Sequence, residues 1–133
     1  MGLLDRFRKK KEVEKISAES TKITTELEKF CGSDKETYEG LLNTMALDPR
    51  KIGTPLKEAV ENAKKAEKEK DSIIAREWYR VAGSLAIYEG SAKKAAEFFN
   101  EAQRIFPGEK FPFLKNPEKA VAKAQEYYKK HLT

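Results

Sequence analysis

The chain has 133 residues, the size of one domain; 39% of them are apolar, 37% are charged, and the net charge is +5. Its single cysteine excludes an intramolecular disulfide, and its single histidine leaves no Cys/His metal cluster and little room for histidine-based catalysis. No apolar run approaches the about 20 residues that a membrane-spanning helix needs, and the first residues lack the apolar stretch of a signal peptide. We therefore expect a non-enzymatic protein with no cofactor and no metal, cytoplasmic or peripheral at the membrane.

The positive charge is concentrated at the beginning of the chain. Residues 1–11 (MGLLDRFRKKK) hold five basic side chains and one acidic side chain, so they carry +4 of the net charge of +5. The other residues are close to neutral with mixed signs, which is typical of solvated helix faces. Their abundance of Lys and Glu, with few Gln, Asn and Cys, is compatible with a thermophilic source.

Residues 1–11 form a basic amphipathic tip. Three bulky apolar side chains beside a basic run suit the surface of an anionic membrane, where each basic group contributes on the order of 1 kcal/mol. The alternatives are contact with nucleic acid, docking on the rest of the protein, or a disordered basic end. The residues of this candidate contact are Leu3, Leu4, Arg6, Phe7, Arg8, Lys9, Lys10 and Lys11.

After the tip, apolar residues recur at steps of three and four, which predicts helices and almost no strand. A seam from Val13 to Phe30 predicts a helix from residue 12 that closes at Gly32. Whether this seam packs inside or against another copy is left open. A second helix is predicted over about 35–47, ending before Pro49.

Four more helices are predicted beyond a loop at 48–54. They cover about residues 55–70, 73–88, 92–106 and 117–131. Ser, Thr, Asp and Asn side chains accept hydrogen bonds from the first free backbone N–H groups of a helix. The expected caps of this kind are Ser33 or Asp34, Thr54, Asp71 or Ser72, and Asn116.

Residues 76–109 combine small and aromatic side chains at fixed positions. Small residues let two helices approach closely, and aromatic residues fill the space beside them. The positions that carry the pattern are Tyr79, Gly83, Gly90, Ala95, Phe99, Ala102 and Pro107. This segment resembles a tetratricopeptide repeat, a helical hairpin with a period of 34 residues. It departs from the family at Ala82 and Ala86, where larger side chains are usual.

The resemblance implies an all-α fold of about six helices in a right-handed stack of antiparallel hairpins, forming one domain over residues 12–133. Only half of the pattern is kept one period earlier, over 42–75, so the matched hairpin would be flanked by degenerate helical pairs. Two alternatives are an ordinary alanine-rich hairpin and a three-helix MIT domain, to which residues 55–106 are similar.

The resemblance also implies a protein–protein interaction adaptor, because such stacks bind partner segments on the face formed by the first helix of each hairpin. That face would present Glu77, Arg80, Ser84 and Ile87. Arg80 stands where a carboxylate-binding subgroup of the family often has Lys, but Ser84 departs from the subgroup's Asn, which counts against a C-terminal carboxylate clamp. The alternative for Arg80 is an ion pair with Glu77 or Glu89 on a solvated face.

Two other functions follow from the tip rather than from the hairpin. One is a membrane-surface scaffold anchored through residues 1–11. The other is a nucleic-acid-associated accessory protein, whose binding would depend steeply on salt.

Three further features are the aromatic loop after the fifth predicted helix, the aromatic end of the last helix, and the single cysteine. The loop at 107–115 is rich in aromatic residues and is expected to fold back as a lid on the core, with an exposed patch for a partner as the alternative. Tyr127, Tyr128 and His131 are expected at core and rim positions of the last helix. Cys31 has no histidine nearby in the sequence that would make it a nucleophile.

Overall fold

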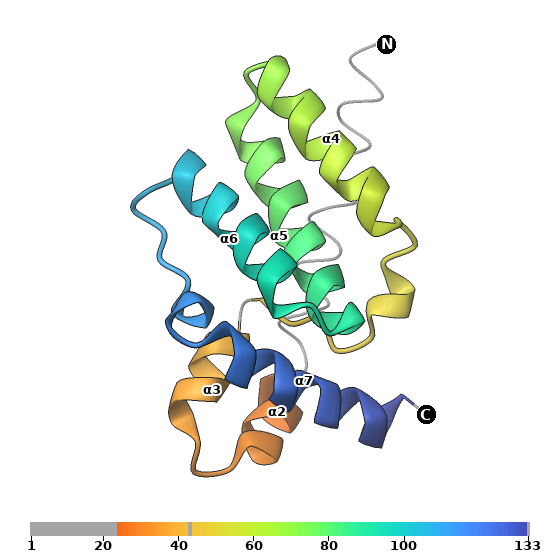
Figure 1. The fold of residues 1–133 in the computed structure, drawn as a ribbon, viewed down its shortest axis with the longest axis vertical. Coiled ribbons are helices and arrows are strands. Elements are labelled where there is room, and N and C mark those ends of the chain that lie inside the picture. The colour runs from red at the N-terminus through yellow and green to blue at the C-terminus, as the bar shows by residue number, and fades with distance from the viewer. Residues whose placement is uncertain (1–23, 43, 133) are drawn as a thin grey trace.

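A computed structural model describes residues 24–42 and 44–132, and this part of the chain is helical, without a strand (Figure 1). The elements are α2 (Thr24–Cys31), α3 (Lys35–Leu41), α4 (Leu56–Lys68), α5 (Ser72–Glu89), α6 (Ala92–Ile105) and α7 (Pro117–His131), with the 3₁₀ turns η1 (Pro49–Lys51) and η2 (Pro112–Lys115). The all-α prediction is confirmed.

Most helices begin at the predicted caps. The side chains of Asp34, Asp71 and Asn116 each accept a hydrogen bond from a backbone N–H in the first turn of their helix. Thr54 is the exception, and the prediction that it caps α4 is wrong. Pro55 itself is the N-cap, with an extended backbone at φ −63° and ψ 153°, so Thr54 lies one residue too early to reach the free N–H groups.

α3 is shorter than predicted, because it ends at Leu41 rather than near residue 47. The Thr44 hydroxyl donates to the Gly40 carbonyl at 2.7 Å, a local bond that competes with continued helix. Residues 44–48 have no regular structure, and Met45, Ala46 and Leu47 are buried there, as is Ile52 just after η1.

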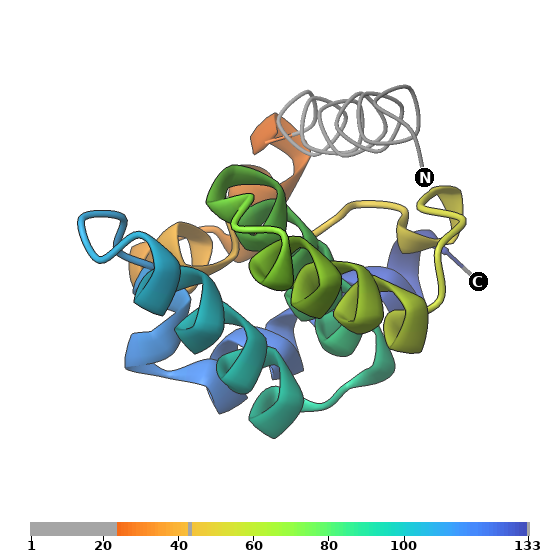
Figure 2. The same cartoon turned by 90° about the horizontal axis from the view of Figure 1, so that it is seen from above.

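The central elements are three antiparallel helices, with α5 lying between α4 and α6 and packing on both (Figure 1). α7 packs against α5 and α6, and α2 and α3 pack on α7. α3 also packs on η2 and lies apart from α4, as the view from above shows (Figure 2). The helical pair expected immediately before the matched hairpin is therefore not formed as α3 with α4.

The α5–α6 hairpin depends on a close approach at Gly83. A Cβ atom at this position would lie 2.5 Å from Cζ of Phe99, whose side chain is fully buried. At the end of α5, Gly90 has φ 84°, a left-handed conformation that favours glycine and closes the helix. Both glycines have the places that the sequence pattern predicts.

The aromatic loop after α6 folds onto the core. Phe111 and Phe113 are 5% and 1% exposed, and their ring centroids lie 5.4 and 5.1 Å from that of Phe99. The predicted lid is confirmed for these two residues. Phe113 also reaches α3, because its backbone lies 3.4 Å from the position of a Cβ on Gly40.

Replacement of Gly83 by alanine tests the close approach. Overpacking a core in this way costs about 1–3 kcal/mol, which exceeds the about 0.5–1 kcal/mol by which alanine favours a helix. We expect Gly83→Ala to lower the free energy of unfolding in urea. Gly108→Ala is the matched control, because a Cβ at Gly108 meets nothing within 4 Å. Equal stability of the two variants would contradict the proposed packing.

Candidate functional site

The candidate site lies on one face of α5. Residues 73, 77, 80, 84 and 87 recur at steps of four and three, so they form a single stripe along this helix. The stripe contains the four predicted partner-binding residues and one more, Ile73. The two halves of the stripe have different environments.

The half toward the end of α5 is covered by the chain itself. Ile87 is fully buried, and the Gln125 side chain donates to the carbonyls of Ile87 and Tyr88 at 2.7 and 2.9 Å. The hydroxyl of Ser84 donates to the carbonyl of Thr44, so the stretch before η1 lies against this part of the helix. The structure thus corrects the placement of Ile87, which lies in the core rather than on an accessible face, and it gives Ser84 an internal partner.

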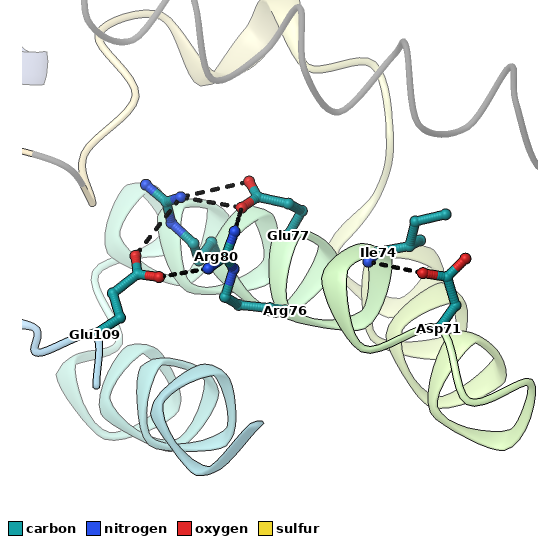
Figure 3. Close-up of polar contacts among 6 residues, drawn as sticks. All are labelled: Asp71, Ile74, Arg76, Glu77, Arg80 and Glu109. Carbon is teal, nitrogen blue, oxygen red and sulfur yellow. Dashed lines mark hydrogen bonds and ion pairs between the residues drawn. The ribbon is translucent and has the colours of Figure 1, made fainter. Parts of the chain in front are cut away.

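In the other half of the stripe, Glu77 and Arg80 belong to a charged cluster that also includes Arg76 of α5 and Glu109 from the loop after α6 (Figure 3). Glu77 lies between the two arginines, 3.0 Å from Arg76 Nη2 and 3.2 Å from Arg80 Nη1. Glu109, from the loop after α6, places Oε2 at 2.7 Å from Arg76 Nη1 and Oε1 at 3.9 Å from Arg80 Nη1. The ion pair of Arg80 with Glu77, which the sequence offered as the alternative to partner binding, is confirmed.

These groups are partly buried. The side chains of Arg76 and Arg80 are 23% and 22% exposed, that of Glu77 is 16% and that of Glu109 is 34%. The guanidinium carbon of Arg76 lies 4.6 Å from the centre of the Phe106 ring, a cation–π contact. The cluster therefore holds two planar guanidinium groups in fixed orientations at the surface.

Beside the cluster, Ile73 is exposed. Its exposed fraction is 53%, and the other large apolar side chain exposed in the described part of the chain is Tyr88, at 37%. The sequence reasoning missed Ile73, although its position four residues before Glu77 places it on the same face. It also missed the bond of Arg76 to Glu109, for which no local signal exists at a separation of 33 residues.

A second charged network joins the three central helices. Arg104 Nη2 lies 2.7 Å from Glu67 on α4 and 2.7 Å from Glu101 on α6. Burial raises the pKa of the Tyr79 hydroxyl on α5, and its hydrogen bond with Glu67 acts in the same direction. This network connects α4, α5 and α6, and we assign it a structural role.

A shallow groove of about 560 Å³ lies where α7 passes the end of α5. It is lined by Tyr88, Ala122, Gln125, Glu126, Tyr128, Lys129 and Leu132. Tyr128 is 5% exposed, and its hydroxyl donates to the Ala46 carbonyl at 2.6 Å. The predicted core positions of Tyr127 and Tyr128 and the rim position of His131 are confirmed.

The described residues include the single cysteine and the single histidine of the chain. Among them no three His, Cys, Asp or Glu side chains come together in a way that could hold a metal ion. Burial raises the pKa of the Cys31 thiol, which disfavours the reactive thiolate. None of the described helices is both long enough and apolar enough to cross a membrane.

The predicted contact at residues 1–11 lies outside the described residues, as does most of the seam that begins at Val13. From this seam Leu27 is buried, and Phe30 packs edge-on against Tyr127 with centroids 5.4 Å apart. No family model, no curated protein and no solved structure matches the chain.

Replacement of Tyr128 tests how firmly the stretch before η1 is held. Tyr128→Phe leaves the buried Ala46 carbonyl without this donor, and a lost buried hydrogen bond of this kind costs about 1–3 kcal/mol. We expect a lower urea midpoint and faster amide exchange at residues 45–47. Tyr88→Phe is the control, since the Tyr88 ring lies 5.2 Å from that of Tyr128 but is partly exposed. Both substitutions keep the aromatic ring, so an equal loss in the two variants would contradict a specific role for the hydrogen bond to Ala46.

Alkaline pH provides a second test of Tyr128. Burial raises the pKa of its hydroxyl, so the folded state keeps the proton after the unfolded chain loses it near pH 10. This stabilisation is complete below pH 10. It decreases as the pH rises toward the pKa of the Tyr128 hydroxyl in the folded state, by at most about 1.4 kcal/mol per pH unit. We expect urea unfolding between pH 9 and about pH 11.5 to show this decrease in the native chain. In Tyr128→Phe the decrease should be smaller, and equal slopes would disprove the assignment.

Proposed function

We propose that the chain is a non-enzymatic adaptor that binds a segment of a protein partner on the first half of the α5 stripe. The observation that supports this most is an exposed isoleucine beside charged groups that are already fixed in place. Ile73 supplies an apolar anchor, and Glu77 and Arg80 supply polar contacts on the same face. Interfaces often combine a central apolar or Arg anchor with a polar rim.

We also propose that α5 and α6 form a tetratricopeptide-like hairpin, stacked between α4 and α7. Support comes from Gly83 facing Phe99, from the left-handed Gly90 at the turn, and from the full burial of Ala95 and Ala102. The packing of α3 on α7 limits this stack to the part of the chain after residue 55. The face proposed for binding then lies on α5, the first helix of the hairpin that carries the pattern.

The adaptor is tested with Ile73→Asp. Ile73 lies in the first turn of α5 and is 53% exposed, so an acidic residue there should leave the free energy of unfolding within about 0.5 kcal/mol. Loss of an interface anchor costs about 2 kcal/mol or more, so we expect affinity for the partner to fall by more than tenfold. Affinity capture from the native host identifies the partner, and a binding titration of the captured protein measures its affinity for each variant. Urea unfolding measures the stability of each variant.

Ala122→Asp is the matched control, because it makes the same kind of change on the exposed side of α7 beside the Tyr88 groove. A partner lost with Ile73→Asp and kept with Ala122→Asp supports binding on α5, and the reverse moves the site to the groove. Removal of residues 1–11 tests the two alternatives. Loss of vesicle binding alone would favour the membrane scaffold, and loss of RNA or DNA binding would favour the nucleic-acid protein.

A further inference from the structure

We infer that Arg76 and Arg80 form a carboxylate receptor that the chain's own Glu109 occupies, and that an acidic side chain of the partner replaces Glu109 on binding. The inference rests on the proposed function for its biological role. The receptor itself is a property of the cluster and can be tested without the partner.

The geometry shows one carboxylate that reaches two arginines. Arg76 and Arg80 stand one turn apart on α5, and Glu109 approaches both from a different part of the chain (Figure 3). Its Oε2 lies 2.7 Å from Arg76 Nη1, and its Oε1 lies 3.9 Å from Arg80 Nη1. Arg76 makes the short bond, and Arg80 adds charge from the next turn. A free carboxylate could take the same position.

Glu109 is the member of the cluster that can leave. Glu77 belongs to α5 and contacts both arginines, whereas Glu109 lies in the loop between α6 and η2. The Glu109 side chain is the most exposed of the four, and a Cβ on the preceding Gly108 would meet no atom within 4 Å. Rotation of the Glu109 side chain away from the arginines therefore disturbs no helix.

The arginines would stay in place without Glu109. Glu77 remains bonded to both of them, and the Phe106 ring remains against the Arg76 guanidinium. Of the four charges, two positive and one negative would be left, a net charge of +1 on groups that are already oriented. A site ordered in advance binds more tightly, because less side-chain freedom is lost on binding.

The partner that fits this site is an acidic segment with an apolar residue. The carboxylate would bind between Arg76 and Arg80, and the apolar side chain would lie on Ile73, one turn earlier on the same helix. Glu109 competes at the high effective concentration of a tethered group, so the apolar contact is needed for displacement. Added salt should weaken the interaction, since the charged groups are partly exposed.

The probe is a short blocked peptide of glutamates with one leucine, compared with its glutamine counterpart, and titrated into the full chain. Binding is followed by fluorescence anisotropy and by the NMR signals of the arginine Nε–H groups. We expect the glutamate peptide to shift the Arg76 and Arg80 signals. Glu109→Gln and Glu109→Ala should each tighten its binding by at least about fivefold, because the tethered competitor is gone. Arg76→Gln should reduce binding to the level of the glutamine peptide.

Glu101→Gln is the matched control, because it removes a carboxylate from Arg104 in the other network and should leave peptide affinity unchanged. The NMR spectrum of each variant shows whether it is folded. The inference is overturned if the glutamine peptide binds equally well, or if the Glu109 variants leave affinity for the glutamate peptide unchanged. Failure of the proposed function looks different: the partner would then bind Ile73→Asp normally while the peptide results stand.

Discussion

The contact between Gly83 and Phe99 is the constraint on which the rest of the structure depends. It sets the distance between α5 and α6, because any larger residue at position 83 would overlap the buried ring. The same ring is the surface on which Phe111 and Phe113 pack, and Phe113 extends the contact to α3. One close approach thus determines the hairpin, the path of the loop after α6 and the position of the first described helices.

The position of Glu109 follows from this packing. Two residues after Glu109, Phe111 packs on Phe99. Three residues before Glu109, Phe106 lies against the guanidinium of Arg76. The backbone at Glu109 is therefore held near the arginines by aromatic contacts on both sides, and the ion pairs of its side chain add little. Ion pairs at partly exposed positions contribute about 0–1 kcal/mol to stability. The exchange of one carboxylate for another is thus a small step in free energy, although the residues around it are firmly packed.

The sequence was sufficient where a signal is local. The caps at Asp71 and Asn116 and the close approach at Gly83 depend on residues a few positions apart or on one helical pair. The sequence was insufficient where contacts between distant segments determine the backbone path. The sequence pattern predicts helix to about residue 47, yet residues 44–47 are buried without helix, because side chains of α5 and α7 donate hydrogen bonds to the carbonyls of Thr44 and Ala46. The bond of Arg76 to Glu109 was beyond any local pattern.

The two halves of the α5 stripe differ for the same reason, because contacts with distant segments cover the second half and leave the first half partly exposed. The polar groups of its second half are satisfied inside the protein, by Thr44 at Ser84 and by Gln125 at the end of the helix. In the first half, Ile73 is exposed, and the charged groups beside it keep a fifth or so of their surface in water. A partner gains binding free energy by burying apolar surface and by meeting charges that are already oriented. These conditions are met on the first half, so the same helix serves the core at one end and presents the proposed binding surface at the other.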